Sequence, residues 1–468
     1  MKFANKILAL ILAATMAFGG CVVASAAEDT DYTINNPYET VDFDSWGQYK
    51  ADLHCHTTAS DGDNTLTEMV EEHYAQGYDA LAVTDHGIVS RNWTSVNSRN
   101  YFKIGLTIKD GKIPQINPIT EERYQQISTG ADRNGRPMVE IPLGIEQNPT
   151  SFNNAHVNSW YADYGDGLMG GTSNYTEVVS QVDTAGGLSV INHPGEYTGA
   201  KEEECQADAY NEDDLWYSYV INKFTDLLTT YDSCIGIDIN SKKDGRTKYD
   251  RKLWDILLTK VVPTGRNVFA IATTDAHQLD KVGCAWTSLC MPENNAENIR
   301  TCLENGTFFA VSRYIKNTEE LAQFSLETGI DWGESFELDI RDDSIPAPKV
   351  TDITVDEKND IISLSVENAL TVHWIADGKV IHIGNTIDLD DYSDEIGSYV
   401  RAEAFGHGGV LYTQAFTLEY DNAPESEGSY FFDFGNILTE IKYLLIDMCN
   451  SIPIGKAVFE FLTAPVTK

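Results

Sequence analysis

Residues 52–62 read DLHCHTTASDG, and residues 81–87 read LAVTDHG. The first stretch places His54 and His56 on alternate positions of an expected short strand, so their side chains point the same way. Asp61 follows in a loop that a glycine closes, which leaves room for a ligand beside the two rings. A His-x-His pair alone is weak evidence for a metal site, because most histidines are satisfied polar groups. The rest of the chain decides the interpretation.

Length and charge limit the classes of function. A chain of 468 residues is long enough for a large core and more than one domain. Its net charge of -39, without a visible Lys/Arg cluster, disfavours a nucleic-acid polymer as partner, because an acidic surface repels phosphate. Seven of the eight cysteines lie beyond Cys21 without Cys-x-x-Cys spacing. We expect them to be small buried hydrophobes rather than a metal or redox site.

The first 27 residues have the layout of a secretory signal peptide. A basic start is followed by an apolar run over 7–18 and by small residues at 24–26. The apolar run is shorter than a membrane anchor needs. We therefore expect cleavage near Ala26 or Ala27 and an extracytoplasmic location, with a lipoprotein anchored through Cys21 as the alternative.

Residues 40–318 alternate helical and strand patterns, which indicates β-α units and a largely parallel sheet. The first expected helix starts after Thr65, contains Leu66, Met69, Val70 and Tyr74, and leads into a strand at 80–83. The later expected helix–strand pairs are 175–185 with 188–191, 215–228 with 235–239, 250–258 with 268–273, and 297–303 with 308–311.

Three further segments have other patterns. Residues 91–135 interrupt the alternation, and both a substrate-covering insertion and an idle surface loop fit them. Residues 345–420 alternate apolar and polar positions between turns, which predicts an antiparallel β-sandwich-like module. Residues 421–468 read as a polar linker and an amphipathic helix with apolar positions from Ile437 to Met448, which docks on the body or lies on a membrane surface.

Polar side chains with metal-ligand character follow the carboxyl ends of the expected strands, where α/β folds place their active sites. They are His54, His56, Asp61, Asp85, His86, Glu146, His156, His193, Asp238, Asn240, Asp275 and His277. Imidazoles and carboxylates from successive strand ends are what a multinuclear site for Zn, Mn or Fe requires. The alternative, in which each residue separately caps a helix or a loop, does not account for six histidines at strand ends.

The motifs DLHCHTTASDG, AVTDHG, GIE, NHPG and TDAH, in this order over residues 48–315, resemble the PHP (polymerase and histidinol phosphatase) domain metallohydrolases. The resemblance implies a distorted (β/α)7 barrel with two or three divalent ions. It also implies His54, His56 and Asp275 as ligands of a first ion. Glu146 would bridge this ion to a second one, completed by His156 and His193, and Asp61, His86 and His277 would hold a third. His156 is the least secure position, because the spacing after the bridging Glu varies in that family.

Further roles follow from the same resemblance. We expect Glu146, Asp275 and His86 to take part in catalysis. Asp85 and Asn192 are expected to orient His86 and His193 from behind. The role of Asp238 stays open. Arg313, just after the last expected barrel strand, is a candidate phosphate contact, with a surface ion pair as the alternative.

The expected chemistry is metal-assisted hydrolysis, in which water is acidified toward hydroxide and the cations neutralise developing charge. Net positive charge at such a site suits a small phosphate ester, so a phosphoesterase is the first hypothesis. The second is hydrolysis of an ester, carbamate or amide, because the layout of a barrel followed by GTFFAVSR and a β module is similar to carbamate-ester metallohydrolases. The third is a non-catalytic surface-binding protein, against which the complete set of nine ligand positions argues.

Overall fold

The structure is a computed structural model that describes residues 30–95, 98–100, 104, 113–147, 156–167, 175–196, 215–241, 247–338 and 344–426. The predicted signal peptide with Cys21, and the predicted terminal helix, lie outside these residues. Within the described parts, no helix has the length and apolar character needed to span a membrane.

The first predicted helix is confirmed as α2 (Leu66–Ala75). Thr65 caps it: its hydroxyl accepts from the Glu68 N–H, and the Glu68 carboxylate accepts from the Thr65 N–H, a reciprocal pair that satisfies two backbone donors. The buried face carries the predicted apolar residues and also His73. The other described α-helices are α4 (Glu121–Thr129), α5 (Tyr175–Thr184), α6 (Leu215–Thr230), α7 (Thr247–Val261), α8 (Ala296–Asn305) and α9 (Thr318–Thr328).

Two sheets carry the helix–strand units, which confirms the α/β class. In the first, β2 (Gly47–Asp52), β3 (Ala80–Leu81) and β4 (Val139–Glu140) run parallel, and β10 (Ala285–Met291) joins β2 to β11 (Phe308–Ser312) in antiparallel pairing. The second has the order β5 (Ile145–Gln147), β6 (His156–Trp160), β7 (Leu188–Asn192), β8 (Cys234–Ser241) and β9 (Phe269–Thr273). The pairing of the described residues gives open sheets rather than one closed barrel.

The two sheets approach each other at the carboxyl ends of their strands. An isolated parallel bridge joins His86 to Glu146, and another joins Cys55 to Ala276. The amide of His56 donates to the carbonyl of Ala276 at 2.9 Å. The segments that follow β2, β3 and β9 therefore meet β5 at one edge of the fold.

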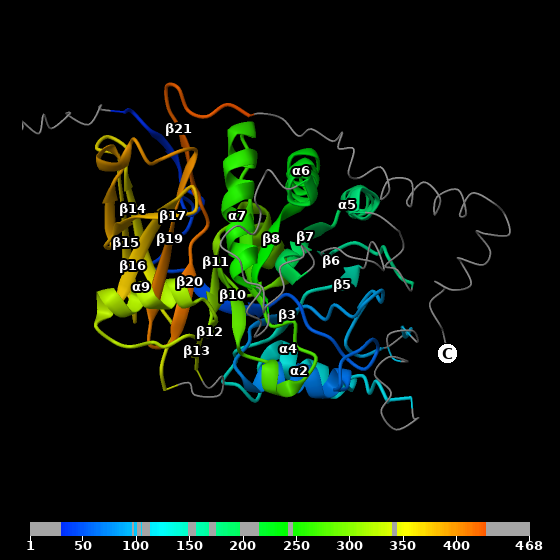
Figure 1. Cartoon of the computed structure of the whole chain (residues 1–468). Coiled ribbons are helices and arrows are strands. Elements are labelled where there is room, and N and C mark those ends of the chain that lie inside the picture. The colour runs from blue at the N-terminus through cyan, green and yellow to red at the C-terminus, as the bar shows by residue number, and fades with distance from the viewer. Residues whose placement is uncertain are drawn as a thin grey trace, which may run out of the picture.

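The C-terminal strands form the predicted antiparallel arrangement. They are β14 (Lys349–Asp356), β15 (Ile361–Glu367), β16 (Thr371–Ala376), β17 (Lys379–Ile383), β18 (Thr386–Asp388), β19 (Tyr399–Gly406), β20 (Gly409–Tyr412) and β21 (Phe416–Glu419). Figure 1 shows β14–β17 and β19 grouped beside α9, away from α5 and α6. Short strands complete the pairing: β1 (Thr33–Asn35) joins β21, and β12 (Tyr314–Ile315) joins β13 (Phe336–Glu337).

These strands continue the sheet of the N-terminal part. Ala310 of β11 pairs with Tyr412 of β20, so one sheet runs from β4 through β2 and β11 to β19 and β21. One apolar core contains Leu253 and Trp254 of α7 together with Tyr399 and Phe405 of β19. The domain boundary expected between 318 and 345 stays a prediction.

The described cysteines are buried, as expected for small hydrophobes. They are Cys55, Cys234, Cys284, Cys290 and Cys302.

Candidate metal centre

His54 and His56 lie directly after β2, and both are fully buried. Their Nε2 atoms are 2.9 Å apart, and each lies near Asp275 Oδ1, at 3.4 and 3.2 Å respectively. The two side chains share the predicted direction, although β2 ends at Asp52 and the expected short strand does not extend to His54 and His56. Two imidazole nitrogens and a carboxylate oxygen converging on one point are suitable ligands for one divalent ion.

The carboxylate of Glu146, on β5, lies at the centre of the site and is 1% exposed. Its Oε2 atom accepts no hydrogen bond, yet it is buried among imidazole nitrogens. These are His56 Nε2 at 3.1 Å, His86 Nδ1 at 3.1 Å and His54 Nε2 at 3.3 Å. The other oxygen, Oε1, lies 2.6 Å from His156 Nδ1 and 3.0 Å from His193 Nε2. A buried carboxylate oxygen that faces only ring nitrogens fits a bridging ligand between cations.

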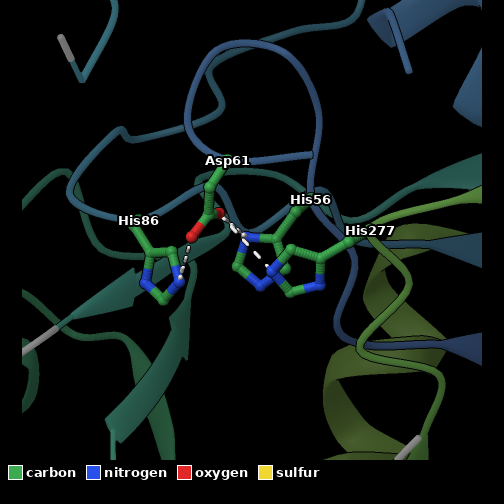
Figure 2. Close-up of side chains that lie close together, drawn as sticks. All are labelled: His56, Asp61, His86 and His277. Atoms are coloured by element: carbon green, nitrogen blue, oxygen red, sulfur yellow. Dashed lines mark ion pairs between the residues drawn. The ribbon is translucent and has the colours of Figure 1, made fainter. Parts of the chain in front are cut away.

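A group of one carboxylate and three rings lies beside Glu146. Asp61 extends from its loop between His86 on one side and the His56 and His277 rings on the other (Figure 2). Asp61 Oδ2 is 3.4 Å from His86 Nε2, and Asp61 Oδ1 is 3.5 Å from His277 Nε2. The side chains of Asp61 and His277 are 17% and 36% exposed, so this group forms the accessible side of the centre.

The structure brings all nine predicted ligand residues together in four overlapping groups. They are His54–His56–Asp275, His54–Glu146–His193, His86–Glu146–His156 and His56–Asp61–His86–His277. The first and last groups contain the trios expected for the first and third ions. His156 and His193 fall into different groups that share Glu146, so the trio expected for the second ion is divided. The assignment of ligands to particular ions stays a prediction.

His156 reaches the centre in a way that the sequence did not indicate. It opens β6, which is antiparallel to both β5 and β7, and it pairs with Asn192 at the end of β7. The beginning of an antiparallel strand lies at the same edge as the carboxyl ends of its neighbours. The expectation that every ligand follows a strand end is therefore wrong for His156, although its position at the site is not.

Most of the resolved pKa shifts favour cation binding. His56 is the exception, because contacts with Asp275 and Glu146 outweigh burial and raise its pKa well above the ordinary value, so a cation would have to displace a proton from this ring. Burial by itself raises the pKa of Glu146, but the neighbouring His86 and His156 rings bring it well below its ordinary value. The pKa of Asp61 is also lowered, because His86 and His277 outweigh the effect of burial. Burial lowers the pKa of His54 and keeps this ring neutral. Ionised carboxylates and a neutral imidazole are the protonation states that bind metal.

Two residues expected to orient neighbouring ligands make different contacts. Asp85 accepts hydrogen bonds from the Thr57 amide at 2.7 Å, the Thr57 hydroxyl at 2.7 Å and the Ser60 hydroxyl at 2.6 Å. It therefore fixes the loop that carries Asp61, and its described hydrogen bonds do not reach the His86 ring. This corrects its expected role.

Asn192 likewise contacts residues other than the His193 ring. Its Nδ2 atom donates to Glu146 Oε1 at 3.0 Å and lies 2.9 Å from His54 Nδ1. Asp238, whose role was open, is buried and accepts from the Thr273 hydroxyl, and burial raises its pKa to about 7. Asp238 thus holds the end of β9, two residues before Asp275.

Arg313 packs against an aromatic ring. The residue is 7% exposed, and its guanidinium lies 5.7 Å from the centroid of the Trp286 ring. Its amide donates to the carbonyl of Cys284. A contact between Arg313 and a phosphate group stays a prediction.

Asn158 is a buried site residue that the sequence reading missed. It is the cross-strand partner of Glu146, and neither polar atom of its amide has a hydrogen-bond partner. The sequence could have indicated this residue, because Asn158 lies two positions after His156 and therefore on the same face of β6.

Comparisons with known proteins agree with this site. Residues 52–212 match the model of the PHP domain family. A 5'-3' exoribonuclease of Haemophilus influenzae is 54% identical over 41 residues, which is 9% of this chain and 15% of that protein. The DNA polymerase/3'-5' exonuclease PolX of Bacillus subtilis is 32% identical over 69 residues, which is 15% of this chain and 12% of that protein. The chain thus spans less than a sixth of the length of either relative.

Among solved structures, a two-domain protein from Bacteroides vulgatus, containing a predicted PHP-like metal-dependent phosphoesterase, is similar with a TM-score of 0.37 and 15% identity. The match covers 81% of this chain and 90% of that one.

The fold and the ligand cluster define an α/β protein in which grouped His, Asp and Glu side chains could bind metal. The part of the chain that matches the PHP domain model, residues 52–212, contains His54, His56, Asp61, His86, Glu146, His156 and His193.

Proposed function

We propose that this chain is a metal-dependent hydrolase and that its substrate is a small phosphate ester. The convergence of nine ligand side chains around the buried Glu146 carboxylate carries this proposal. The site would hold two or three divalent ions of Zn, Mn or Fe, since His, Asp and Glu ligands accept all three. Ions held there would supply Lewis acidity and positive charge for attack by water on the phosphorus atom.

The chain's own groups have defined parts in this reaction. Glu146 would help to hold the ions together with the rings around it, and its negative charge would offset part of theirs. The more exposed Asp61 and His277 side chains would face the entering substrate. Asp85 would keep Asp61 in place through the Thr57 and Ser60 contacts.

The scaffold would be the distorted (β/α)7 barrel. The isolated bridges His86–Glu146 and Cys55–Ala276 support this, because they join the edges of the two sheets on both sides of the site. The signal-like residues 1–27 support export. The net charge of -39 supports a small substrate over a nucleic-acid polymer.

The experiment compares an aryl phosphate, the matching aryl carboxylate ester and the matching aryl carbamate as substrates of the metal-loaded chain. The expected result is phosphate release that is lost in Glu146→Gln. Cleavage of only the carboxylate ester or carbamate, with the same loss in the variant, would replace the phosphoesterase by an ester or carbamate hydrolase. Absence of turnover with all three substrates would contradict the hydrolase proposal.

A further inference from the structure

A buried histidine outside the ligand cluster contacts the segment that carries the first ligands. His73 lies on α2, and its Nε2 atom is 2.9 Å from Asp52 Oδ2. Its Nδ1 atom donates to the carbonyl of Met69 at 2.8 Å, and the ring edge meets Tyr78 with 4.9 Å between ring centroids. His73 and Asp52 are both 0% exposed. The ring is thus fixed at both nitrogens.

The Asp52 carboxylate links two strands of the centre. Its Oδ1 atom accepts from the amide of His54 and from the amide of Thr274, each at 3.2 Å. Its Oδ2 atom also accepts from the Thr274 hydroxyl. One side chain therefore holds the end of β2, which carries His54, to the end of β9, which leads into Asp275.

This link is needed because Asp275 has an unfavourable backbone conformation. Its φ of 44° lies in the left-handed region, which Asp adopts more readily than most residues but less readily than glycine, so contacts that hold this turn stabilise it. The preceding Thr274 is held at both its amide and its hydroxyl by Asp52. The carboxylate therefore maintains the turn that directs Asp275 Oδ1 toward His54 and His56.

We propose that His73 is a positioning residue of the metal centre, which acts through Asp52 on His54 and Asp275. A carboxylate without exposure to water needs polar contacts for its oxygens, and the His73 ring, fixed by Met69, lies 2.9 Å from Asp52 Oδ2. Without the ring, Asp52 would turn toward other donors and release Thr274. The inference rests on the proposed metal centre but requires no particular substrate.

The test measures metal affinity rather than turnover. His73→Leu and His73→Gln are compared with the natural chain by competition of Co²⁺ with a chelating dye, and the Co²⁺ absorption spectrum reports the ligand geometry. Affinity is expected to fall by about 10- to 100-fold in His73→Leu, as for other groups that orient metal ligands. His73→Gln, whose amide can still donate to Asp52, should recover part of the loss.

The matched controls are His382→Leu and His382→Gln on β17, where the natural ring contacts the Tyr392 hydroxyl. These two variants should leave the affinity for Co²⁺ and the Co²⁺ absorption spectrum unchanged. Thr274→Val tests the same link from the other side, because it removes the hydroxyl contact to Asp52 and keeps His73. It should lower the affinity for Co²⁺ and alter the Co²⁺ absorption spectrum as His73→Leu does.

The proposal would be overturned if the metal-free His73 variants unfold at a lower midpoint but bind Co²⁺ with an affinity within twofold of the natural chain. His73 would then have a structural role only. The same holds if Thr274→Val leaves affinity unchanged when His73→Leu does not fold. Weakened Co²⁺ binding in a chain that hydrolyses none of the three aryl substrates would support the positioning role and contradict only the hydrolase proposal.

Discussion

Glu146 and His156 are in direct contact, with 2.6 Å between Oε1 of the carboxylate and Nδ1 of the ring. The other oxygen of Glu146 lies near three further rings, so this carboxylate is the group that connects the separate ligand sets. Glu146→Gln removes the charge and replaces one ligand oxygen by an amide nitrogen, which cannot bind a cation. The variant should lose at least one bound ion, and kcat/KM should fall by at least about 100-fold.

Elemental analysis and steady-state kinetics check this expectation. Glu140→Gln is the matched control, because Glu140 is a largely buried carboxyl on the adjoining β4 that lies outside the four ligand groups. An unchanged metal content in Glu146→Gln would contradict the bridging role.

Asp61→Asn should remove one ion and leave the others in place. Asp61 contacts His86 and His277 at the more exposed side of the centre, whereas His54, Glu146 and Asp275 are almost completely buried. Metal content per chain should therefore fall by about one equivalent in elemental analysis. The neighbouring exposed Asp63→Asn should show no loss, and loss of all ions in Asp61→Asn would show that the groups do not bind independently.

The pH dependence of stability should be altered by Glu140→Gln. Burial raises the pKa of Glu140 from its ordinary value of 4.5 to about 8, although hydrogen bonds from Tyr124 and the Trp93 backbone act in the opposite direction. Between these pH values the folded state keeps a proton that the unfolded state has lost, so the free energy of unfolding falls as pH rises. The penalty is absent below pH 4.5 and complete above pH 8, where it reaches up to about 5 kcal/mol.

Urea unfolding of the metal-free chain and of Glu140→Gln at pH 5, 7 and 9 measures this effect. The stability of the variant relative to the natural chain should rise with pH. Parallel stability curves would show that Glu140 ionises normally in the folded state.

The junction between α7 and β19 should depend on one buried ion pair. Arg401 donates to both oxygens of Asp255, at 2.7 and 2.8 Å, and the two side chains are only 5% and 9% exposed. Asp255→Asn leaves the guanidinium with the more distant Glu403 carboxylate, 3.7 Å from Nη1, as its remaining counter-charge among the described ion pairs. It should lower the free energy of unfolding by up to about 3 to 5 kcal/mol. Glu304→Gln, which breaks the exposed pair with Arg300, should cost less than about 1 kcal/mol. Denaturant unfolding separates these outcomes, and equal effects of the two variants would contradict the importance of the junction.

Local signals in the sequence predicted much of the fold and the membership of the site. Thr65 and Glu68 define the start of α2 through contacts within one helical turn, so a short stretch of sequence contains the needed information. The alternation of His54 and His56 is equally local. To predict which residues gather at the site, it was enough to assume that the strand ends meet at one edge, as they do in α/β folds of this type.

Contacts between distant segments could not be read from the sequence. The direction of β6, which places His156, depends on pairing with β5 and β7 rather than on residues 156–160 themselves. The pairing of Ala310 with Tyr412 joins segments about a hundred residues apart, and no local pattern specifies it. The contacts of Asp85 and Asn192 likewise depend on loop geometry, so their sequence neighbours His86 and His193 were misleading guides.

The most direct test of the account is the hydrolysis rate of an aryl phosphate measured against the number of divalent ions bound per chain, starting from chelator-treated protein. The account predicts negligible turnover without metal, a rise that levels off at two or three bound ions, and loss of both binding and turnover when His54 and His56 are replaced by alanine. Turnover that is independent of bound metal, or a chain that binds less than one ion with the nine side chains intact, would contradict it.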